Sequence, residues 1–296
     1  MYAGDFANAA KEAEAALAIS SGFEKAYLVQ AVAALAASKP DEAKQAYEKM
    51  AQAGSRGASL SALGLADLAM HEGRYAAAAA VIGQSLADQQ AAGSRRDRAI
   101  KRAVLGEIYL AGGRTAEAAK AARDALAEDR QNAIVPAARL LVRSGQDREA
   151  RELADELDRQ IQKQGRAYAR LIRAEMALTR ARTTEALDLL TDAKGLADLW
   201  LVRFTLGRAF EEAGQHAEAL SELEQCEKRR GEATAVFLDD VPTYRHLGPL
   251  AYWRARAQEG LGMKDAAAEN YKAYLALREN VTGDPLAADA RKRVGR

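Results

Sequence analysis

Three histidines, His71, His216 and His246, are the side chains in this sequence best suited to proton transfer or metal binding. None is paired at the four-residue spacing that places two imidazoles on one face of a helix. His71 is expected at a helix end, His216 follows Gly214 in a turn, and His246 lies in a segment that interrupts the pattern described below. The sequence therefore predicts neither a metal site nor a bound cofactor.

The single cysteine, Cys226, could act as a nucleophile only as a thiolate, which requires an open and basic setting. It falls instead at a position that equivalent segments fill with Ala16, Ser85, Ala125 and Ala193. We therefore expect a small buried side chain. One cysteine also excludes an internal disulfide and a thiolate cage for a metal.

Asp239 and Asp240 form a carboxylate pair of the kind used in general acid–base catalysis. Because they stand just before Pro242, a turn is their ordinary explanation. One alternative keeps an enzyme open: a site in which these two acids meet Tyr244 and His246. It would require a deep pocket joining the four side chains and strongly shifted pKa values. Without such a pocket we expect no catalytic residue and a protein that is not an enzyme.

The composition is that of tightly packed helices. Hydrophobic residues make up 49% of the 296 residues, whereas aromatic residues reach only 6%, and strands favour branched and aromatic side chains. Lys and Arg number 43 against 42 Asp and Glu, a formal net charge of +1. No strong field exists to attract nucleic acid or an anionic membrane surface.

The sequence carries no recognisable targeting signal or membrane-spanning segment. No apolar run reaches the roughly 18 residues that a membrane-spanning helix needs. The opening stretch, MYAGDFANAAKEAEA, has neither the basic region nor the apolar core of a signal peptide. We expect a soluble chain and favour the cytoplasm, but the compartment stays open because a periplasmic location would suit part of a membrane-anchored protein.

A repeated alanine organises the whole chain. Its copies are Ala9, Ala43, Ala78, Ala118, Ala150, Ala186, Ala219 and Ala267, separated by 34, 35, 40, 32, 36, 33 and 48 residues. Twelve residues before each copy, from the second on, stand only small residues: Ala31, Ala66, Gly106, Ala138, Ala174, Gly207 and Ala255. Small residues at this spacing indicate two helices that cross closely, because a larger side chain would push them apart.

The fullest copy of the pattern is the stretch LGRAFEEAGQHAEALSELEQC, residues 206–226. Leu206, Gly207 and Phe210 precede the turn at Gly214, as Leu105, Gly106 and Tyr109 precede Gly113. The chain therefore resembles the tetratricopeptide repeat family over nearly its full length. It departs from the family in replacing the early tryptophan, for example with Tyr27, and in lacking the proline that usually closes each repeat. The resemblance implies an all-α fold, a right-handed superhelix of about seven and a half helix-turn-helix repeats with a C-terminal capping helix.

We expect a single solenoid domain over residues 1–296, with boundaries set by the spacing of the repeats. Residues 1–23 form a half repeat and residues 24–233 six repeats, with an insertion near 93–98. A second insertion covers 234–247, the last repeat 248–281, and the capping helix 285–294. Because the half repeat lacks its first helix, we expect that Met1 begins an excised fragment or follows a lost upstream region. An alternative is self-association, in which the unpaired helix stacks on another chain.

Residues 200–296 resemble more narrowly the repeat regions of bacterial multidomain signalling proteins, such as eukaryotic-like serine/threonine kinases. The residues that carry this likeness are Trp200 to Phe204, Cys226, Arg229 to Ala233, Phe237 to Tyr244 and Tyr252 to Gly260. No glycine-rich phosphate loop, His-Arg-Asp loop or Asp-Phe-Gly motif is present, so the likeness implies a signalling context and no kinase activity.

The tetratricopeptide family binds its ligands in a concave groove lined by the first helix of each repeat. That resemblance implies twelve groove residues: Asp67, Met70, His71, Glu107, Arg139, Arg143, Tyr168, Glu175, Phe204, Arg208, Tyr252 and Arg256. We expect a protein or peptide segment to dock there as a non-enzymatic scaffold or sensory module binds its partner. Arg139, Arg208 and Arg256, with Asp67, Glu107 and Glu175, would set the charge register. A solvated face with intrahelical ion pairs is the alternative.

One ligand class is disfavoured. Family members that clamp the acidic tails of chaperones use lysine and asparagine at set positions of the first helices. This chain has Leu63 and Asp67, then Ala103 and Glu107, at the matching places. Carboxylates there would repel a carboxylate tail.

Overall fold

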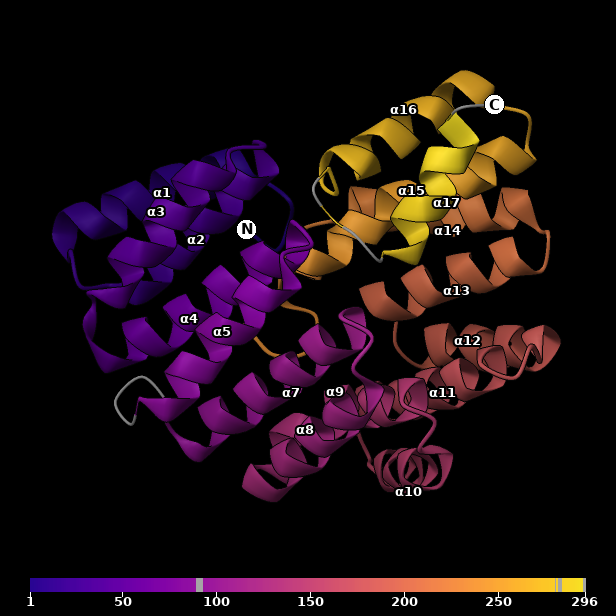
Figure 1. Ribbon diagram of the computed structural model, residues 1–296, viewed down its shortest axis with the longest axis horizontal. Helices are drawn as coiled ribbons and strands as arrows, with labels where there is room; N and C mark the ends of the chain where they lie inside the picture. Colours follow the sequence, from indigo (N-terminus) through magenta and orange to yellow (C-terminus); the bar gives the residue numbers. More distant parts are fainter. Residues whose placement is uncertain (89–92, 280, 282–283, 295–296) are drawn as a thin grey trace.

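The protein, described by a computed structural model, is all-helical, as the composition predicts. The structure describes residues 1–88, 93–279, 281 and 284–294. In these ranges the chain forms α-helices and two short 3₁₀ helices, and no strand. Figure 1 shows the helices following one another around a curve.

The helices pair as antiparallel neighbours after a lone first helix, α1 (Phe6–Ile19). The first three pairs are α2 (Glu24–Ala36) with α3 (Pro40–Ala51), α4 (Gly54–His71) with α5 (Tyr75–Ala87), and α7 (Arg95–Ala111) with α8 (Thr115–Glu128). The next two are α9 (Arg130–Arg143) with α10 (Asp147–Asp158) and α11 (Lys163–Leu178) with α12 (Thr183–Leu196). The last are α13 (Trp200–Glu212) with α14 (His216–Lys228) and α15 (Gly248–Gly260) with α16 (Lys264–Ala276), followed by α17 (Pro285–Val294).

The turn inside each repeat reverses the chain through one residue of left-handed backbone. In the fullest repeat this residue is Gly214, with φ of 73°, and the next amide, of Gln215, donates to the carbonyl of Phe210 over 2.9 Å. This hydrogen bond ties the turn to the last residues of α13, where the Phe210 carbonyl also accepts from the amide of Ala213. The turn between α11 and α12 adopts the same geometry at Ala181, with φ of 55°, where a side chain makes the conformation less favourable.

The small residues lie where helices approach closely, within a repeat at Gly207 and between neighbouring repeats at Gly106. Along α2–α16 every alanine of the second-helix register, from Ala43 to Ala267, is at most 3% exposed. A methyl group on Gly207 would lie 2.8 Å from Leu223 Cγ, and one on Gly106 would lie 2.6 Å from Leu140 Cδ1. Ala9 differs, because α1 packs mainly against α2 and leaves this alanine partly exposed. The close-packing rule therefore holds throughout the paired repeats.

The first insertion predicted near 93–98 is largely a lengthened helix. Ser94 caps α7: its side chain accepts a hydrogen bond from the amide of Asp97, and Asp97 Oδ2 accepts from the amide of Ser94. This reciprocal capping box starts the helix at Arg95. Residues 95–98 therefore form the first turn of α7.

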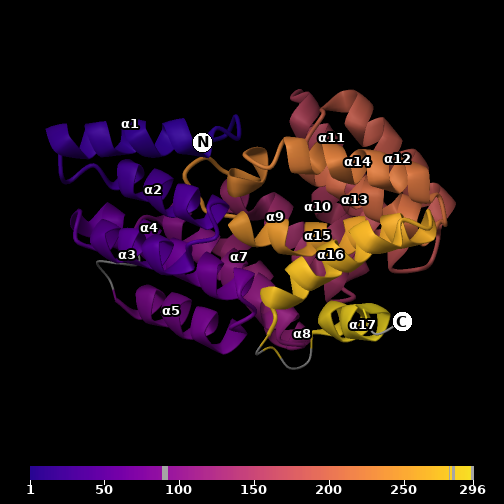
Figure 2. The ribbon, with the colours of Figure 1, turned by 90° about the horizontal axis from the view of Figure 1, so that it is seen from above.

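The second interruption runs through the inside of the curve. Residues 229–247, here called the inner segment, connect α14 to α15 and contain the 3₁₀ helices η1 (Glu232–Ala235) and η2 (Tyr244–Leu247). In both views the inner segment passes between the N-terminal and C-terminal repeats (Figures 1 and 2). Val241 and Tyr244 are buried in the same apolar cluster as α2 and α4. The inner segment thus joins repeats that are far apart along the chain.

A second contact brings the last repeat back to the third. Arg278, just beyond α16, donates to the backbone carbonyl of His71 at the end of α4. The neighbouring Gly73 has no side chain, and a methyl group there would collide with Val281. Residues near α16 and α4 therefore lie against each other, so the solenoid closes on itself at this point.

Replacing Ala118 with leucine should lower the free energy of unfolding by about 1–3 kcal/mol, because this fully buried alanine has no room for a longer side chain. Ala127, in the same helix α8, is exposed, so A127L should change that free energy by less than about 0.5 kcal/mol. Urea denaturation followed by circular dichroism measures both variants. Equal losses would contradict the close-packing rule.

Candidate functional site

The centre of the inner surface is an ion cluster built around Arg245 of η2. Its guanidinium pairs with Asp67 of α4 over 2.8 Å and with Glu107 of α7 over 2.7 Å. The backbone amide of Tyr244 donates to the second oxygen of Asp67 over 2.8 Å. The Asp67 side chain is fully buried, and those of Arg245 and Glu107 are 6% and 12% exposed. Buried charges are tolerated only when they are paired and hydrogen-bonded in this way.

The surroundings shift the pKa values of Glu107, Asp67 and Arg245 in different directions. Burial alone would raise the pKa of Glu107, but the charge and hydrogen bond of Arg245, with the charge of Arg139, bring it down to about 2. Burial dominates at Asp67 and raises the pKa of its carboxyl, although Arg245 acts against this. The two acids hold the pKa of Arg245 above its ordinary value in spite of its burial. Arg245 therefore remains charged and fixes η2 to two first helices.

Aromatic rings of the inner segment pack against the first helices. Tyr244 meets the ring of His71 edge-on, with centroids 5.0 Å apart. Phe237 lies 6.4 Å from Tyr168 of α11 and 6.1 Å from His246. Separately, the hydroxyl of Tyr168 donates to the backbone carbonyl of Val236 over 3.0 Å. These contacts extend the hold of the inner segment from α4 and α7 to α11.

A second buried ion pair lies beside these rings. Arg139 of α9 makes a bidentate pair with Glu175 of α11, with Nη2 2.8 Å and Nε 2.9 Å from the same carboxylate oxygen. Its guanidinium carbon also lies 5.8 Å from the centre of the Phe237 ring. Both side chains are at most 13% exposed, and Glu175 matches the charge of Arg139 inside the protein.

Most of the twelve predicted groove residues are at least partly buried in the structure. Six are buried: Asp67, Met70, Tyr168, Glu175, Phe204 and Tyr252. Five are partly buried: His71, Glu107, Arg139, Arg208 and Arg256. Only Arg143 is exposed. The physical reason is that the inner segment and neighbouring repeats cover the first helices.

Two of the predicted groove residues, Phe204 and Arg256, show the contacts that such residues make inside the protein. Phe204 stacks on Trp200 with the ring planes 13° apart. Arg256 pairs with Glu211 over 3.2 Å and approaches Asp289 of α17 at 3.9 Å. The Phe204 contact therefore lies within α13, whereas Arg256 joins α15 to α13 and α17.

Two positive charges on the inner surface lack a close acid. Arg143, at the end of α9, forms no hydrogen bond or ion pair with the described residues. Arg208 of α13 has its guanidinium 4.9 Å from the ring centre of Trp253, and its nearest carboxylate, of Glu212, is 3.8 Å away. The Nε of Arg208 and the Nε2 of His246 are both buried without a hydrogen-bond partner among the described residues.

The surroundings of Arg143 and Arg208 disfavour the charged form of each side chain and lower its pKa. Desolvation lowers the pKa of Arg143, and the positive charges of Arg139 and Arg208 lower it further. Desolvation also lowers the pKa of Arg208. Every other described arginine with a clear shift has its pKa raised, as Arg245 does. An anion placed between Arg143 and Arg208 would relieve this repulsion.

The side chains considered for catalysis do not share one pocket. Asp240 pairs with Lys25 over 2.7 Å and lies 3.6 Å from Arg56, while His246 lies against Phe237. Cys226 is buried, as its register position predicts, and burial raises the pKa of its thiol. Within the described ranges no group of three or more His, Cys, Asp or Glu side chains is arranged to hold a metal ion. In the same ranges no helix is long and apolar enough to cross a bilayer.

Arg245 is the residue that the sequence analysis missed. Two features of the sequence could have pointed to Arg245. The segment around it is too apolar for a free linker, and the first helices carry two acids, Asp67 and Glu107, without a predicted basic partner. An arginine in an otherwise packed segment needs an acidic partner. The sequence alone gave no means of choosing among the acids of eight repeats.

Comparison with known proteins identifies the fold. No family model matches this sequence. No curated protein matches it either. Among solved structures, a tetratricopeptide repeat protein from Parabacteroides merdae ATCC 43184 is similar, with a TM-score of 0.50 and 13% identity over 92% of this chain and 99% of that one. A chain from the APC/C hetero-tetramer Cut9-Hcn1 is similar with a TM-score of 0.52 and 14% identity, covering 93% of this chain and 49% of that one. The fold is therefore an α-solenoid of the tetratricopeptide type.

Replacing Arg245 with methionine should lower the free energy of unfolding by about 3–5 kcal/mol, because Asp67 and Glu107 would keep buried charges without a partner. Adding D67N and E107Q to R245M should restore part of the loss. R148M serves as the control, because Arg148 is 93% exposed on α10. If R245M and R148M unfold at the same urea concentration, the ion cluster does not hold the inner segment.

Acidification from pH 6.5 to 4.5 should destabilise the fold through His71 and His246. Burial lowers the pKa of His71 to about 4 and that of His246 to about 3, so both stay neutral in the folded state while the unfolded chain binds protons below pH 6.5. Stability is therefore lost as the pH falls, by about 1–2 kcal/mol per histidine. Glu107 contributes its own loss only below pH 4.5, since its folded pKa is about 2, whereas Asp67 acts in the opposite sense.

The variant H71N/H246N isolates this effect, because asparagine cannot take up the proton. Its free energy of unfolding should depend less steeply on pH between 6.5 and 4.5 than that of the unmodified chain. The two slopes come from urea titrations at several pH values. Parallel slopes would show that the histidines are not buried in the neutral form.

Proposed function

We propose that this chain is a non-enzymatic protein-interaction module that binds an acidic protein or peptide segment on its inner surface, at Arg143 and Arg208. The observation that carries the proposal is that Arg143 forms no ion pair with the described residues and that Arg208 has only the long ion pair with Glu212, at 3.8 Å. Other inner-surface charges are paired, Arg245 with Asp67 and Arg139 with Glu175. A carboxylate or phosphate from a partner would supply the missing negative charge.

The accessible part of the surface decides where the partner binds. Asp67 and Glu107 are occupied by Arg245, so a partner would reach them only by displacing η2. Arg143 is exposed, and the side chain of Arg208 is 34% exposed. The partner therefore meets the two arginines first, and Trp253 beneath Arg208 would lie next to the bound group.

The fold neighbours are consistent with a protein partner. One of the similar chains comes from a hetero-tetramer, APC/C Cut9-Hcn1, so a solenoid of this type occurs in an assembly of different proteins. A regulatory place in a bacterial signalling protein is a narrower proposal, supported only by the resemblance of residues 200–296.

The test uses fluorescein-labelled hexaglutamate and hexalysine as probes, at constant ionic strength. Hexaglutamate should bind and change the tryptophan emission, because Trp253 lies against Arg208. The affinity of R143S/R208S for hexaglutamate should be at least about tenfold lower, because a hydrogen-bonded charge contributes about 1.5–3 kcal/mol. Arg139 and Arg256 are unsuitable for the test, because their reversal would break internal pairs.

R148S is the matched control, since it removes an exposed arginine away from the inner surface. It should bind hexaglutamate as the unmodified chain does. Equal binding of the two probes, or binding unaffected by R143S/R208S, would remove the inner surface as the acidic-ligand site.

A further inference from the structure

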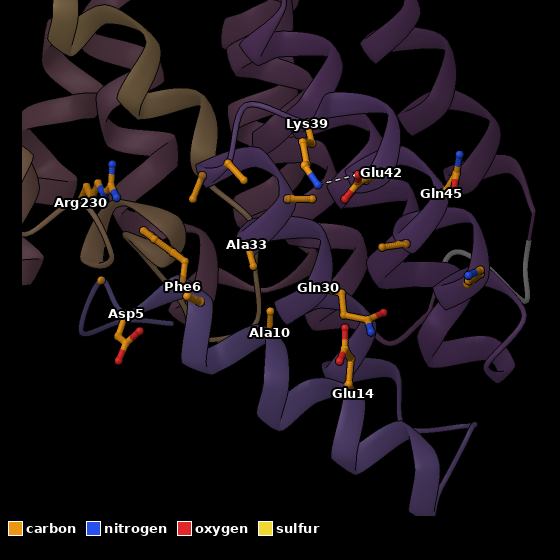
Figure 3. Close-up of a pocket in the computed structure, with 17 residues that line it drawn as sticks. Asp5, Phe6, Ala10, Glu14, Gln30, Ala33, Lys39, Glu42, Gln45 and Arg230 are labelled. Atoms are coloured by element: carbon orange, nitrogen blue, oxygen red, sulfur yellow. Dashed lines mark ion pairs between the residues drawn. The ribbon is translucent and has the colours of Figure 1, made fainter.

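The inner segment is anchored at its start by close packing against the N-terminal residues. A methyl group on Gly231 would lie 2.3 Å from the carbonyl oxygen of Tyr2 and 2.5 Å from the amide nitrogen of Gly4. Next to it, the guanidinium carbon of Arg230 lies 5.3 Å from the ring centre of Phe6 in α1, at one end of the pocket drawn in Figure 3. These groups do not titrate between pH 4 and pH 7, so the anchor does not depend on pH in that range.

Beyond the anchor, the inner segment is closed on itself through Thr243. The Thr243 hydroxyl donates to the carbonyl of Ala233 over 2.7 Å and accepts from the amide of Val236 over 2.9 Å. The amide of Thr243 donates to the carbonyl of Thr234 over 3.0 Å. Residues 233–243 therefore form a loop whose two ends are joined by its own hydrogen bonds. The loop can leave the inner surface as a unit, because these bonds are not made to the first helices.

His71 lies where the inner segment meets α4. Its ring packs edge-on against Tyr244, and its Nδ1 is buried without a hydrogen-bond partner among the described residues. The charged groups that face it are Arg278, which pairs with Asp284 over 3.1 Å, and Asp67 one turn earlier on α4, which already belongs to the ion cluster. A second proton on this ring would therefore be buried beside an arginine and find no free acceptor among the described residues.

His246 belongs to the inner segment itself and has the same kind of surroundings. Its ring lies edge-on to Phe237, and its Nε2 is buried without a hydrogen-bond partner among the residues that the structure describes. The charged groups that face it are three bases and one acid: Arg139 and Arg143 of α9, Arg245 of η2, and Glu107 of α7. A second proton on this ring would add to an excess of positive charge.

We propose that the inner segment is released by acid: a second proton on His71 and on His246 detaches residues 233–247 from the first helices while the repeats stay folded. Release uncovers Asp67 and Glu107, which Arg245 otherwise occupies. At neutral pH the ion cluster and the apolar contacts of Val241 and Tyr244 keep the segment in place. The inner surface is therefore closed at neutral pH and opened at acid pH.

The third histidine responds to a proton in the opposite way. His216, at the start of α14, has its Nδ1 2.7 Å from a carboxylate oxygen of Glu211. A proton on this ring would strengthen the contact, because it would turn a hydrogen bond into an ion pair. Together with the anchor at Gly231, this confines the proposed response to the inner segment.

The sign and size of the response follow from proton uptake. Burial holds the pKa of His71 at about 4 and that of His246 at about 3 while the segment is in place. On release each pKa returns towards its ordinary value of 6.5, so the released form takes up protons as the pH falls. From pH 7 to pH 5 this favours release by roughly twentyfold for each histidine. Asp67 opposes it, because burial raises the pKa of its carboxyl and release frees that proton, but one carboxyl acts against two histidines.

Carbodiimide coupling of glycinamide to carboxyl groups, mapped on the full chain by peptide mass spectrometry, tests the proposal. Glu152 is 62% exposed and reports the intrinsic reactivity at each pH. Labelling of Asp67 and Glu107, divided by that of Glu152, should rise at least about tenfold from pH 7 to pH 5, because only the released form exposes these two acids to the reagent.

Two buried acids of α13 and α14 are matched controls inside the same molecule. The side chain of Glu222 is 12% exposed, as that of Glu107 is, and the side chain of Glu211 is 1% exposed. Their labelling relative to Glu152 should not rise, because these helices stay packed. An equal rise at Glu107 and Glu222 would show general unfolding, and no rise at Glu107 would show a segment that stays in place; either result overturns the proposal.

Histidine variants identify the groups that take up the protons. H71N/H246N should show no rise in the labelling of Glu107 at pH 5, because asparagine cannot be protonated there. H216N is the matched control and should show the full rise. A rise that persists in H71N/H246N would also overturn the proposal, whereas the comparison of Glu107 with Glu222 in the unmodified chain needs no variant to fold.

Discussion

The whole structure depends on how closely the two helices of each repeat cross. The crossing is lined by glycine and alanine, and at Gly207 even one methyl group would have to displace Leu223. Because backbones can approach only where side chains are this small, each repeat stacks on the next in nearly the same way. The curved inner surface is a consequence of that stacking, since the first helices of all repeats face the same side.

That inner surface is largely filled by the chain itself. Arg245 joins Asp67 and Glu107, which lie on different repeats, and Phe237 and Tyr244 pack against the first helices. The arrangement makes the inner segment resemble a bound peptide that is covalently part of its receptor. On the same surface, Arg143 has no ion pair with a described residue, and Arg208 has only the long pair with Glu212. The proposed interaction surface is what the inner segment leaves uncovered.

The sequence predicted the repeats well because their signal is local. Ala219 follows Gly207 by twelve residues, and this spacing specifies a helix, a turn and a second helix without reference to the rest of the chain. The candidate site could be predicted only in part. The positions of Asp67 and Glu107 on first helices follow from the repeat, but their pairing with Arg245 joins residues far apart in sequence. No local pattern encodes such a pairing, and so the burial of most predicted groove residues was unforeseen.

The claim that the chain fills its own inner surface can be tested directly by amide hydrogen exchange of residues 236–247. The amides of Tyr244 and Arg245 donate to the fully buried Asp67, so they should exchange as slowly as amides in α4. Exchange of these two amides at the rate of an exposed loop would show that the inner segment does not occupy the groove, and the account of the site would fail.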